Sequence, residues 1–429
     1  MIEAKPSDRD IVVEPAREVP VIARPSVLVV GGGPAGIGAA LAAARTGAAT
    51  MIVEPYGFLG GMWTAGLLNP ILDHEHKGGI VAELMDRLAT ADKLVHGPRA
   101  NFDCEYLKVL LDRLMVEAGV DVRLHRTAVE ALVDGDRVVG IVTESKSGRE
   151  AILADVVIDC TGDGDVCALA GVPFTKGRAG DGLMQSVTLF FMLANVRYRQ
   201  PGHGSDIHDL LVEAARRHGL DYEVPYLTPS FFVQPDGDRA IVQIAHIRGI
   251  DGTDADDLTR AEMAAREQIH ETLAVMKLVP EFEGVELVTS GPHIGIRETR
   301  HIQGRYRLEE SDLLAGRAFE DGICWTRFNI DVHTSPAEGT VVIEGGRVQP
   351  YQIPYRALMP VNREGLLMSG RCISGSSRAH GSFRVTGDCV AMGQAAGTAA
   401  ALAVGAGILP SHVAPAALVE RLVADGVTL

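Results

Sequence analysis

The segment from Ser26 to Glu54 places the strongest constraint on how this chain can fold. SVLVV at 26–30 predicts a short buried strand, GGGPAG follows at 31–36, and IGAALAAARTG predicts an Ala-rich helix that ends at Gly47. ATMIV then predicts a second strand, with Glu54 directly after it. This order of strand, glycine turn, helix, strand and acid predicts a βαβ unit that binds a dinucleotide.

Each part of this fingerprint has a mechanical role. Gly31 permits the tight turn from strand to helix, Gly33 lets the backbone approach a pyrophosphate, and Gly36 allows the helix to pack closely on the strand. The free amides at the helix start, where Pro34 and Ala35 lie, are expected to face the diphosphate. Glu54 can accept hydrogen bonds from a ribose 2′-hydroxyl, and its charge disfavours NADP.

The fingerprint alone does not distinguish FAD from NAD, but two other segments favour FAD. A glycine-rich run follows the ribose acid and includes Gly60, Gly61 and Met62, so the backbone can wrap a bulky group beyond the pyrophosphate. Far along the chain, LLMSG at 366–370 predicts a strand, and a Gly-Asp turn with a helix from about Cys389 follows. That helix start is expected to point at the flavin and to stabilise its anionic reduced form, although an unrelated core helix is the alternative. The predicted cofactor residues there are Gly387, Asp388 and Ala391.

These motifs together resemble the FAD-dependent oxidoreductase family, in the second branch of the glutathione-reductase-like FAD-binding superfamily. The matching segments include the fingerprint, LGGMWTAG, DVVIDCTGDGDVCALAG, IGIRETRHIQGRYRL, IPYRALMP and the run from LMSGRCIS to GTAAALA. The resemblance implies FAD as cofactor, and it places Thr161, Gly162 and Asp163 near it. The family often has Arg where this chain has His301, and Thr-His where it has Gly375-Ser376. The substrates of the family are therefore not carried over.

The predicted fold class is α/β, with a doubly wound Rossmann-type FAD-binding domain and a small β-meander. VDGDRVVGIVTE predicts a hairpin that turns at Asp134-Gly135 within the meander. After Gly171 the pattern changes to an apolar strand, SVTLFFML, a long helix at 259–278 and Gly-rich loops. The expected organisation is an N-terminal arm at 1–24, an FAD-binding domain at 25–175 and 351–429, and an inserted α+β substrate domain at 176–350.

Composition narrows the classes of partner. The net charge of −16 repels a polyanion at long range, so nucleic acid is not expected as a partner. The six cysteines show no CxxC or CxxxxC spacing, and the chain does not start with a signal-type apolar run, so a cytoplasmic protein is expected. Residues 389–408 carry no charge, but their Ala and Gly residues favour a buried helix over a membrane span. A homodimer is expected because the proline-rich arm could reach a neighbouring subunit.

Flavin chemistry needs a base for the departing proton and charges that orient the substrate. The run 291–301 concentrates such groups in His293, Arg297, Glu298 and His301. As alternatives, Arg297 and Glu298 could pair with charges across the domain boundary, and His301 could be an exposed loop residue. His380 is the preferred base because the chain returns to the flavin directly after it, with Arg297 and Arg378 as substrate-orienting cations.

Two further clusters, Asn329 to His333 and Asp73 to His76, are weaker candidates. His74 and His76 lack further ligands at useful spacing, so no metal is expected. A covalent bond from one of these histidines to the flavin stays an alternative.

The leading hypothesis is an FAD-dependent dehydrogenase or oxidase that oxidises a small organic substrate by hydride transfer to flavin, with oxygen or another acceptor reoxidising the flavin. Residues 176–350 contain no second GxGxxG, which favours electrons arriving with the substrate. The alternatives are a reductase or monooxygenase that uses diffusing NAD(P)H, a tRNA-modifying flavoprotein, and a non-catalytic FAD-binding scaffold.

Overall fold

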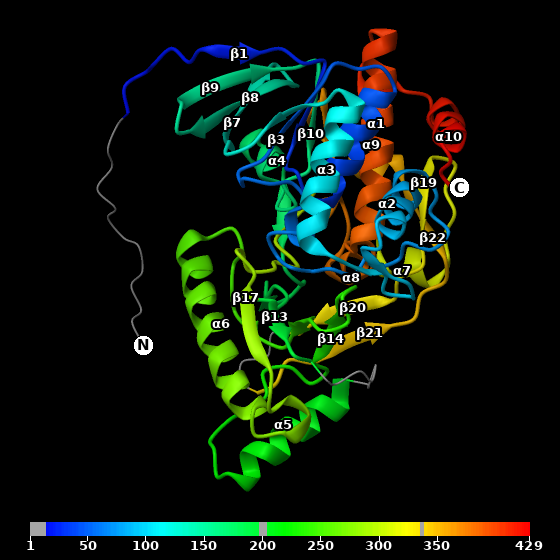
Figure 1. Ribbon diagram of the computed structural model, residues 1–429. Helices are drawn as coiled ribbons and strands as arrows, with labels where there is room; N and C mark the ends of the chain where they lie inside the picture. The colour runs from blue at the N-terminus through cyan, green and yellow to red at the C-terminus, as the bar shows by residue number, and fades with distance from the viewer. Residues whose placement is uncertain (1–13, 197–203, 335–338) are drawn as a thin grey trace.

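A parallel sheet forms the centre of the upper half of the protein (Figure 1). The computed structural model describes residues 14–196, 204–334 and 339–429. The sheet has the order β23-β10-β2-β3-β6, and every pair in it is parallel. Its strands are β2 (Val27–Val30), β3 (Thr50–Val53), β6 (Asp121–Arg123), β10 (Val156–Asp159) and β23 (Leu366–Met368). The expected doubly wound Rossmann-type α/β fold is confirmed.

Two glycine-rich helices pack against each other beside this sheet (Figure 1). They are α1 (Pro34–Arg45) and α9 (Thr386–Ala406). A Cβ atom on Gly393 would lie 2.0 Å from the carbonyl oxygen of Ala35, and one on Gly397 would lie 2.1 Å from that of Ala39. The close crossing of the two backbones therefore requires glycine at both positions.

The start of α9 differs from the sequence prediction. Gly387 and Asp388, which were predicted to form a turn before a helix at about Cys389, lie inside the first turn of α9. The carboxylate of Asp388 favours this arrangement, because an acid in the first turn complements the partial positive charge of the helix start. Of the helices described, α9 alone is long and apolar enough to cross a membrane, yet most of it is buried within the protein. Its apolar composition is thus explained by packing.

The predicted meander is a four-stranded sheet above the parallel one (Figure 1). The strands β7 (Thr127–Asp134), β8 (Arg137–Ser145) and β9 (Gly148–Leu153) are antiparallel, and the turn after Asp134 uses Gly135 at a φ of 63°. From the predicted arm, β1 (Val21–Ala23) pairs with β9, so this part of the arm lies on the chain's own sheet. Residues 1–13 of the arm lie outside the described residues.

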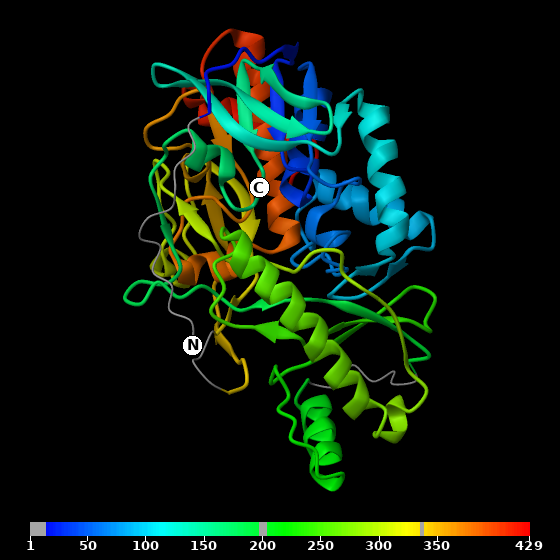
Figure 2. The ribbon, with the colours of Figure 1, turned by 90° about the vertical axis from the view of Figure 1, so that its left-hand side faces the viewer.

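The lower half contains an antiparallel sheet of order β14-β15-β13-β17, with α5 (Gly204–Arg217) and α6 (Ala255–Met276) beside it (Figure 2). Its strands are β13 (Phe191–Ala194), β14 (Ser230–Val233), β15 (Ala240–Gln243) and β17 (Glu286–Ser290). The long helix begins four residues before the predicted Thr259, because the carboxylate of Asp254 accepts the amides of Asp256 and Asp257 and caps it.

The buried apolar side chains form two separate cores. One core fills the lower half and draws its members from Val187 to Ile296. The other fills the upper half, and it includes Ile323 and Cys324, which the expected division assigns to the substrate domain. Both side chains belong to β19 (Gly322–Thr326), which packs next to α9 and pairs with β22 (Tyr351–Pro354). The division at residues 176 and 351 stays a prediction.

Candidate functional site

A cavity of about 520 Å³ lies at the carboxyl ends of the parallel strands. After β2 it is lined by Gly31 and by Gly33 to Ala35, after β3 by Glu54 to Tyr56, after β10 by Cys160 to Asp163, and after β23 by Ser369 to Arg371. Ligands of open parallel sheets bind at this edge, because the loops that follow neighbouring strands meet there. The fold therefore brings together segments that lie more than 300 residues apart in the sequence.

Most of the predicted cofactor residues line this cavity. They are Gly31, Gly33, Pro34, Ala35, Glu54, Gly61, Met62, Thr161, Gly162 and Asp163. Gly36 is absent from the lining and supports the turn instead, since a Cβ atom there would lie 1.8 Å from the carbonyl oxygen of Gly31. Gly60, at a φ of 111°, precedes the short 3₁₀ turn that carries Gly61 and Met62.

The predicted residues at the start of α9 lie beside the cavity rather than in its lining. Gly387 donates its amide to the carbonyl of Leu72 over 3.0 Å, and a Cβ atom on it would lie 2.4 Å from that oxygen. Asp388 pairs with Lys77, and Ala391 is buried in the upper core. Cys389, which directly follows Asp388 in the chain, does line the cavity.

Glu54 is buried and held in a fixed orientation. Its Oε2 accepts the amide of Gly32 over 2.6 Å, and its Oε1 accepts the amide of Tyr56 over 3.0 Å. Burial raises the pKa of Glu54, and the two amide hydrogen bonds oppose that rise. The carboxylate is thereby presented at the end of β3, where the fingerprint requires a ribose acceptor.

Of the predicted catalytic residues, only His293 lines the cavity. Its amide donates to the carbonyl of Ala65 over 3.1 Å, and its ring packs against that of Tyr56 at a centroid distance of 5.6 Å. Burial lowers the pKa of His293, so the ring is neutral at pH 7. Ala65 also lines the cavity, as does Met62, three residues before it in the chain.

His380 and His301 lie together inside the protein, outside the cavity lining. His380 is 1% exposed on α8 (Ser377–Phe383), and its ring meets that of His301 edge to face at 4.9 Å. The Nε2 atom of His301 lies 2.8 Å from Oε1 of Glu298. Burial holds the pKa of His380 well below its usual value. His301 is thus a buried residue on β18 (Arg300–Ile302) and not an exposed loop residue.

The two predicted substrate-orienting arginines have different surroundings. Arg297 is buried, and its Nη1 donates to the carbonyl of Ser186 over 2.8 Å and to Oγ1 of Thr188 over 2.7 Å. Burial lowers the pKa of Arg297 to about 10. Arg378 pairs with Glu310 over 3.0 Å and is partly exposed. Neither arginine lines the cavity.

The weaker sequence clusters also lie apart from the cavity. His333 stacks on His246 and Tyr226 in the interior, and His74 and His76 lie on a loop that precedes α2 (Gly79–Thr90). Among the residues that the structure describes, no group of three His, Cys, Asp or Glu side chains could hold a metal ion.

A comparison with models of protein families identifies the family to which a chain with this site belongs. The family model for FAD dependent oxidoreductases matches residues 26–422, nearly the whole chain. The chain belongs to this family. FAD is therefore the cofactor of the protein, and the site built on the fingerprint is an FAD site.

Three solved structures of flavin-dependent enzymes are similar to this FAD-dependent oxidoreductase over most of its length. The flavin-dependent brominase Bmp2 matches with a TM-score of 0.51 at 12% identity, over 93% of this chain and 83% of that one. The p-nitrophenol 4-monooxygenase PnpA of Pseudomonas putida matches with a TM-score of 0.47 at 13% identity, over 93% and 83% of the two chains. The myxobacterial chondrochloren halogenase CndH matches at 0.49 and 13%, over 94% and 78%. At 12% identity the likeness to the brominase concerns the fold alone.

The residues of the FAD-dependent oxidoreductase fit its cofactor. No side chain caps the start of α1, so its first amides are free to bind the diphosphate. Arg371 lines the cavity and donates from Nη2 to Asp163 over 3.0 Å, while its Nη1 has no partner among the described residues. The buried hydroxyl of Ser369 is also unpartnered there. These groups, with Glu54, would hold the FAD of the family.

Several lining residues were missed by the sequence analysis. Arg126, Thr127 and Ala128 enter the cavity from the start of β7, and Ser369 and Arg371 follow β23. The signal for the second group was present, because LLMSG predicted a parallel strand whose carboxyl end must reach the site. Gly252, Thr253, Ala255 and Leu258 also line the cavity, and no sequence motif marks them.

Proposed function

We propose that this FAD-dependent oxidoreductase oxidises a small organic molecule by hydride transfer to the flavin, and that His293 takes up the proton that leaves with the hydride. The observation that carries the proposal is the position of His293, which alone among the five predicted catalytic side chains lines the FAD cavity. A base must reach the proton it removes, so position takes precedence over the preference for His380.

The environment of His293 suits a general base. Its desolvated ring has a lowered pKa and is neutral at pH 7, so a ring nitrogen is free to accept a proton. The hydrogen bond from its amide to Ala65 and the contact with Tyr56 fix where the ring lies. FAD, when bound, supplies the hydride acceptor. The residues of the chain then hold the substrate against it and exclude water.

Three alternatives give different results. A reductase or a monooxygenase would take electrons from diffusing NAD(P)H, so its flavin would be bleached by NADH without substrate. A tRNA-modifying enzyme would bind tRNA at low salt, which the net charge of −16 opposes. A small-molecule substrate, a cytoplasmic location and a homodimer belong to the proposal and await their own measurements.

The role of His293 is tested by two substitutions at matched residues. Secondary alcohols, 2-hydroxy acids and primary amines are first mixed anaerobically with the wild-type holoenzyme, and the compound that bleaches its flavin is kept. We expect His293→Gln to slow single-turnover flavin reduction by about 10²–10³-fold. His380→Gln, whose ring lies outside the cavity lining, should reduce the rate far less. Equal rates for His293→Gln and wild type would remove His293 as the base.

A further inference from the structure

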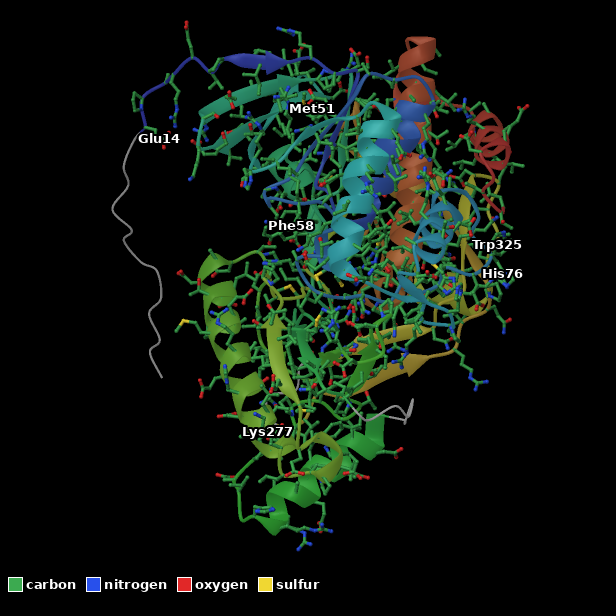
Figure 3. All side chains as sticks on the ribbon, in the orientation of Figure 1. Glu14, Met51, Phe58, His76, Lys277 and Trp325 are labelled. Carbon is green, nitrogen blue, oxygen red and sulfur yellow. The ribbon has the colours of Figure 1, made fainter. Side chains whose placement is uncertain are left out.

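A segment of the lower half reaches into the FAD cavity of the upper half. Residues 250–258, here called the cap segment, connect β16 (His246–Ile247) to the first turn of α6. Gly252, Thr253, Ala255 and Leu258 of this segment line the cavity. Figure 3 labels Lys277 at the lower end of α6, so the opposite end of the helix, which carries the cap segment, lies toward the upper half. Two separately packed parts of the chain thus share one cavity.

The cap segment is held in one shape by its own hydrogen bonds. The Oδ1 atom of Asp251 accepts the amide of Thr253 over 2.9 Å and its hydroxyl over 2.7 Å. The amide of Asp251 donates in turn to Oδ2 of Asp257 over 2.8 Å. An aspartate that bonds a backbone amide two residues later forms a compact turn, so the segment keeps its shape without a ligand.

Lys176 ties this turn to the upper half. Its Nζ lies 2.6 Å from Oδ2 of Asp251 and also donates to the hydroxyl of Thr253. Lys176 ends β11 (Phe174–Lys176), which pairs with β18, and Ile302 of β18 belongs to the upper core. The lysine therefore acts as a latch between the two parts that form the cavity.

A second chain of contacts leads from the cap segment to the loop after β10. Gly252 is buried, and a Cβ atom added to it would lie 2.8 Å from Cγ2 of Ile296 and 2.9 Å from Cγ2 of Thr299. The hydroxyl of Thr299 donates to Oδ1 of Asp163 over 2.8 Å, and Asp163 lines the cavity. The position of the cap segment is thereby coupled to a loop that carries predicted cofactor residues.

We propose that the cap segment is the outer wall of the FAD site, closed by the latch from Lys176, and that it retains the bound cofactor. FAD leaves only after the cap segment moves away from the cavity. The inference rests on FAD as the cofactor of the family and is independent of the direction of electron flow. It adds Gly252, Thr253, Ala255 and Leu258 to the FAD-binding residues and makes Lys176 a positioning residue.

The latch is tested by the rate at which FAD leaves the holoenzyme. Dilution of the holoenzyme releases FAD, and the increase in flavin fluorescence reports the rate. We expect Lys176→Met to raise this rate about fivefold, as the loss of a partly exposed ion pair allows. Lys277→Met removes the same charge at the far, exposed end of α6 and should leave the rate unchanged. An unchanged rate of FAD release in Lys176→Met would overturn the proposal that Lys176 holds the cap segment closed.

The wall itself is tested by thiol labelling. All six native cysteines are buried, so a cysteine placed at an exposed residue reacts against a low background, and peptide mass spectrometry identifies it. We expect Ala255→Cys to react at least about tenfold more slowly in the holoenzyme than after removal of FAD. Met263→Cys, at a residue that is 64% exposed and outside the cavity, should react equally in both forms.

Equal labelling of Ala255→Cys with and without FAD would overturn the proposal that the cap segment forms the outer wall of the FAD site. Neither labelling nor FAD release requires turnover. A failure of the proposed substrate oxidation would therefore leave both results intact, and a failure of the wall would leave the bleaching experiment intact.

Discussion

The Nζ atom of Lys77 lies 2.5 Å from Oδ1 of Asp388, and both side chains are buried. Lys77 also pairs with Asp73 over 2.9 Å and donates to the carbonyl of Trp325 over 2.5 Å. One buried cation thus joins the loop before α2, the first turn of α9 and β19. This cluster fixes the helix start that lies next to Cys389 in the cavity wall.

Removal of the Lys77 charge should destabilise the fold strongly. In Lys77→Met, Asp388 and Asp73 are left buried without their cation, and a broken buried pair costs about 3–5 kcal/mol. Urea unfolding measures the change in the free energy of unfolding. Lys277→Met, at an exposed residue, is the control and should change it little. A loss below about 1 kcal/mol for Lys77→Met would contradict the assigned role of the cluster.

The close contact between α1 and α9 predicts opposite effects for two glycines of the same helix. Gly393→Ala places a methyl group 2.0 Å from the carbonyl oxygen of Ala35, and we expect a loss of about 1–3 kcal/mol together with weaker FAD binding. Gly405→Ala meets nothing within 4 Å and should stabilise the helix by about 0.5–1 kcal/mol. Thermal unfolding and FAD titration check both variants, and equal stability of the two would contradict the account.

The buried histidines His246 and His333 predict acid destabilisation at mildly acidic pH. Burial lowers the pKa of both rings, to about 4 for His333, and the charge of Arg297 acts in the same direction while Asp331 opposes it. The folded chain therefore binds fewer protons than the unfolded chain. The stability that the neutral rings contribute is complete above pH 6.5 and is lost as the pH falls toward 4.

The test of this dependence is the slope of unfolding free energy against pH. Each ring contributes up to about 1.4 kcal/mol per pH unit within that range. His333→Gln should flatten the slope, whereas His76→Gln at an exposed residue should not. Identical slopes for wild type and His333→Gln would show that the ring is not buried in its neutral form.

The pKa of His293 predicts the pH profile of flavin reduction. Because burial lowers this pKa below 6.5, the neutral ring that accepts a proton persists into mildly acidic solution. The anaerobic reduction rate should stay level from alkaline pH down to 6.5 and fall only below it. His293→Gln should remove the acid limb of the profile. A limb at pH 7 or above, or one that persists in His293→Gln, would assign it to another group.

The sequence predicted those parts of the site whose residues are neighbours in the chain. The turn at Gly31 and the acid at Glu54 each follow a recognisable apolar strand, so local pattern was enough to find them, whereas the loop at Thr161 was placed by the family resemblance. The hairpin at Asp134-Gly135 was likewise predictable from its turn residues.

The remaining residues depend on partners that no local pattern identifies. Arg297 bonds to Thr188, Arg378 to Glu310 and Asp388 to Lys77, each pair being separated by more than 60 residues. The preference for His380 failed to anticipate its burial against His301, because helix α8 turns that ring into the core. The catalytic roles of these residues stay predictions.

Under the proposed function, electrons enter this FAD-dependent oxidoreductase from its organic substrate. The most direct measurement is the visible absorption of the holoenzyme during anaerobic mixing, first with each member of the substrate panel and then with NADH alone. We expect flavin absorption that is bleached by a panel compound without NADH and is unaffected by NADH alone. Bleaching by NADH alone, with no response to any organic compound, would contradict it and assign the protein to the reductases or monooxygenases.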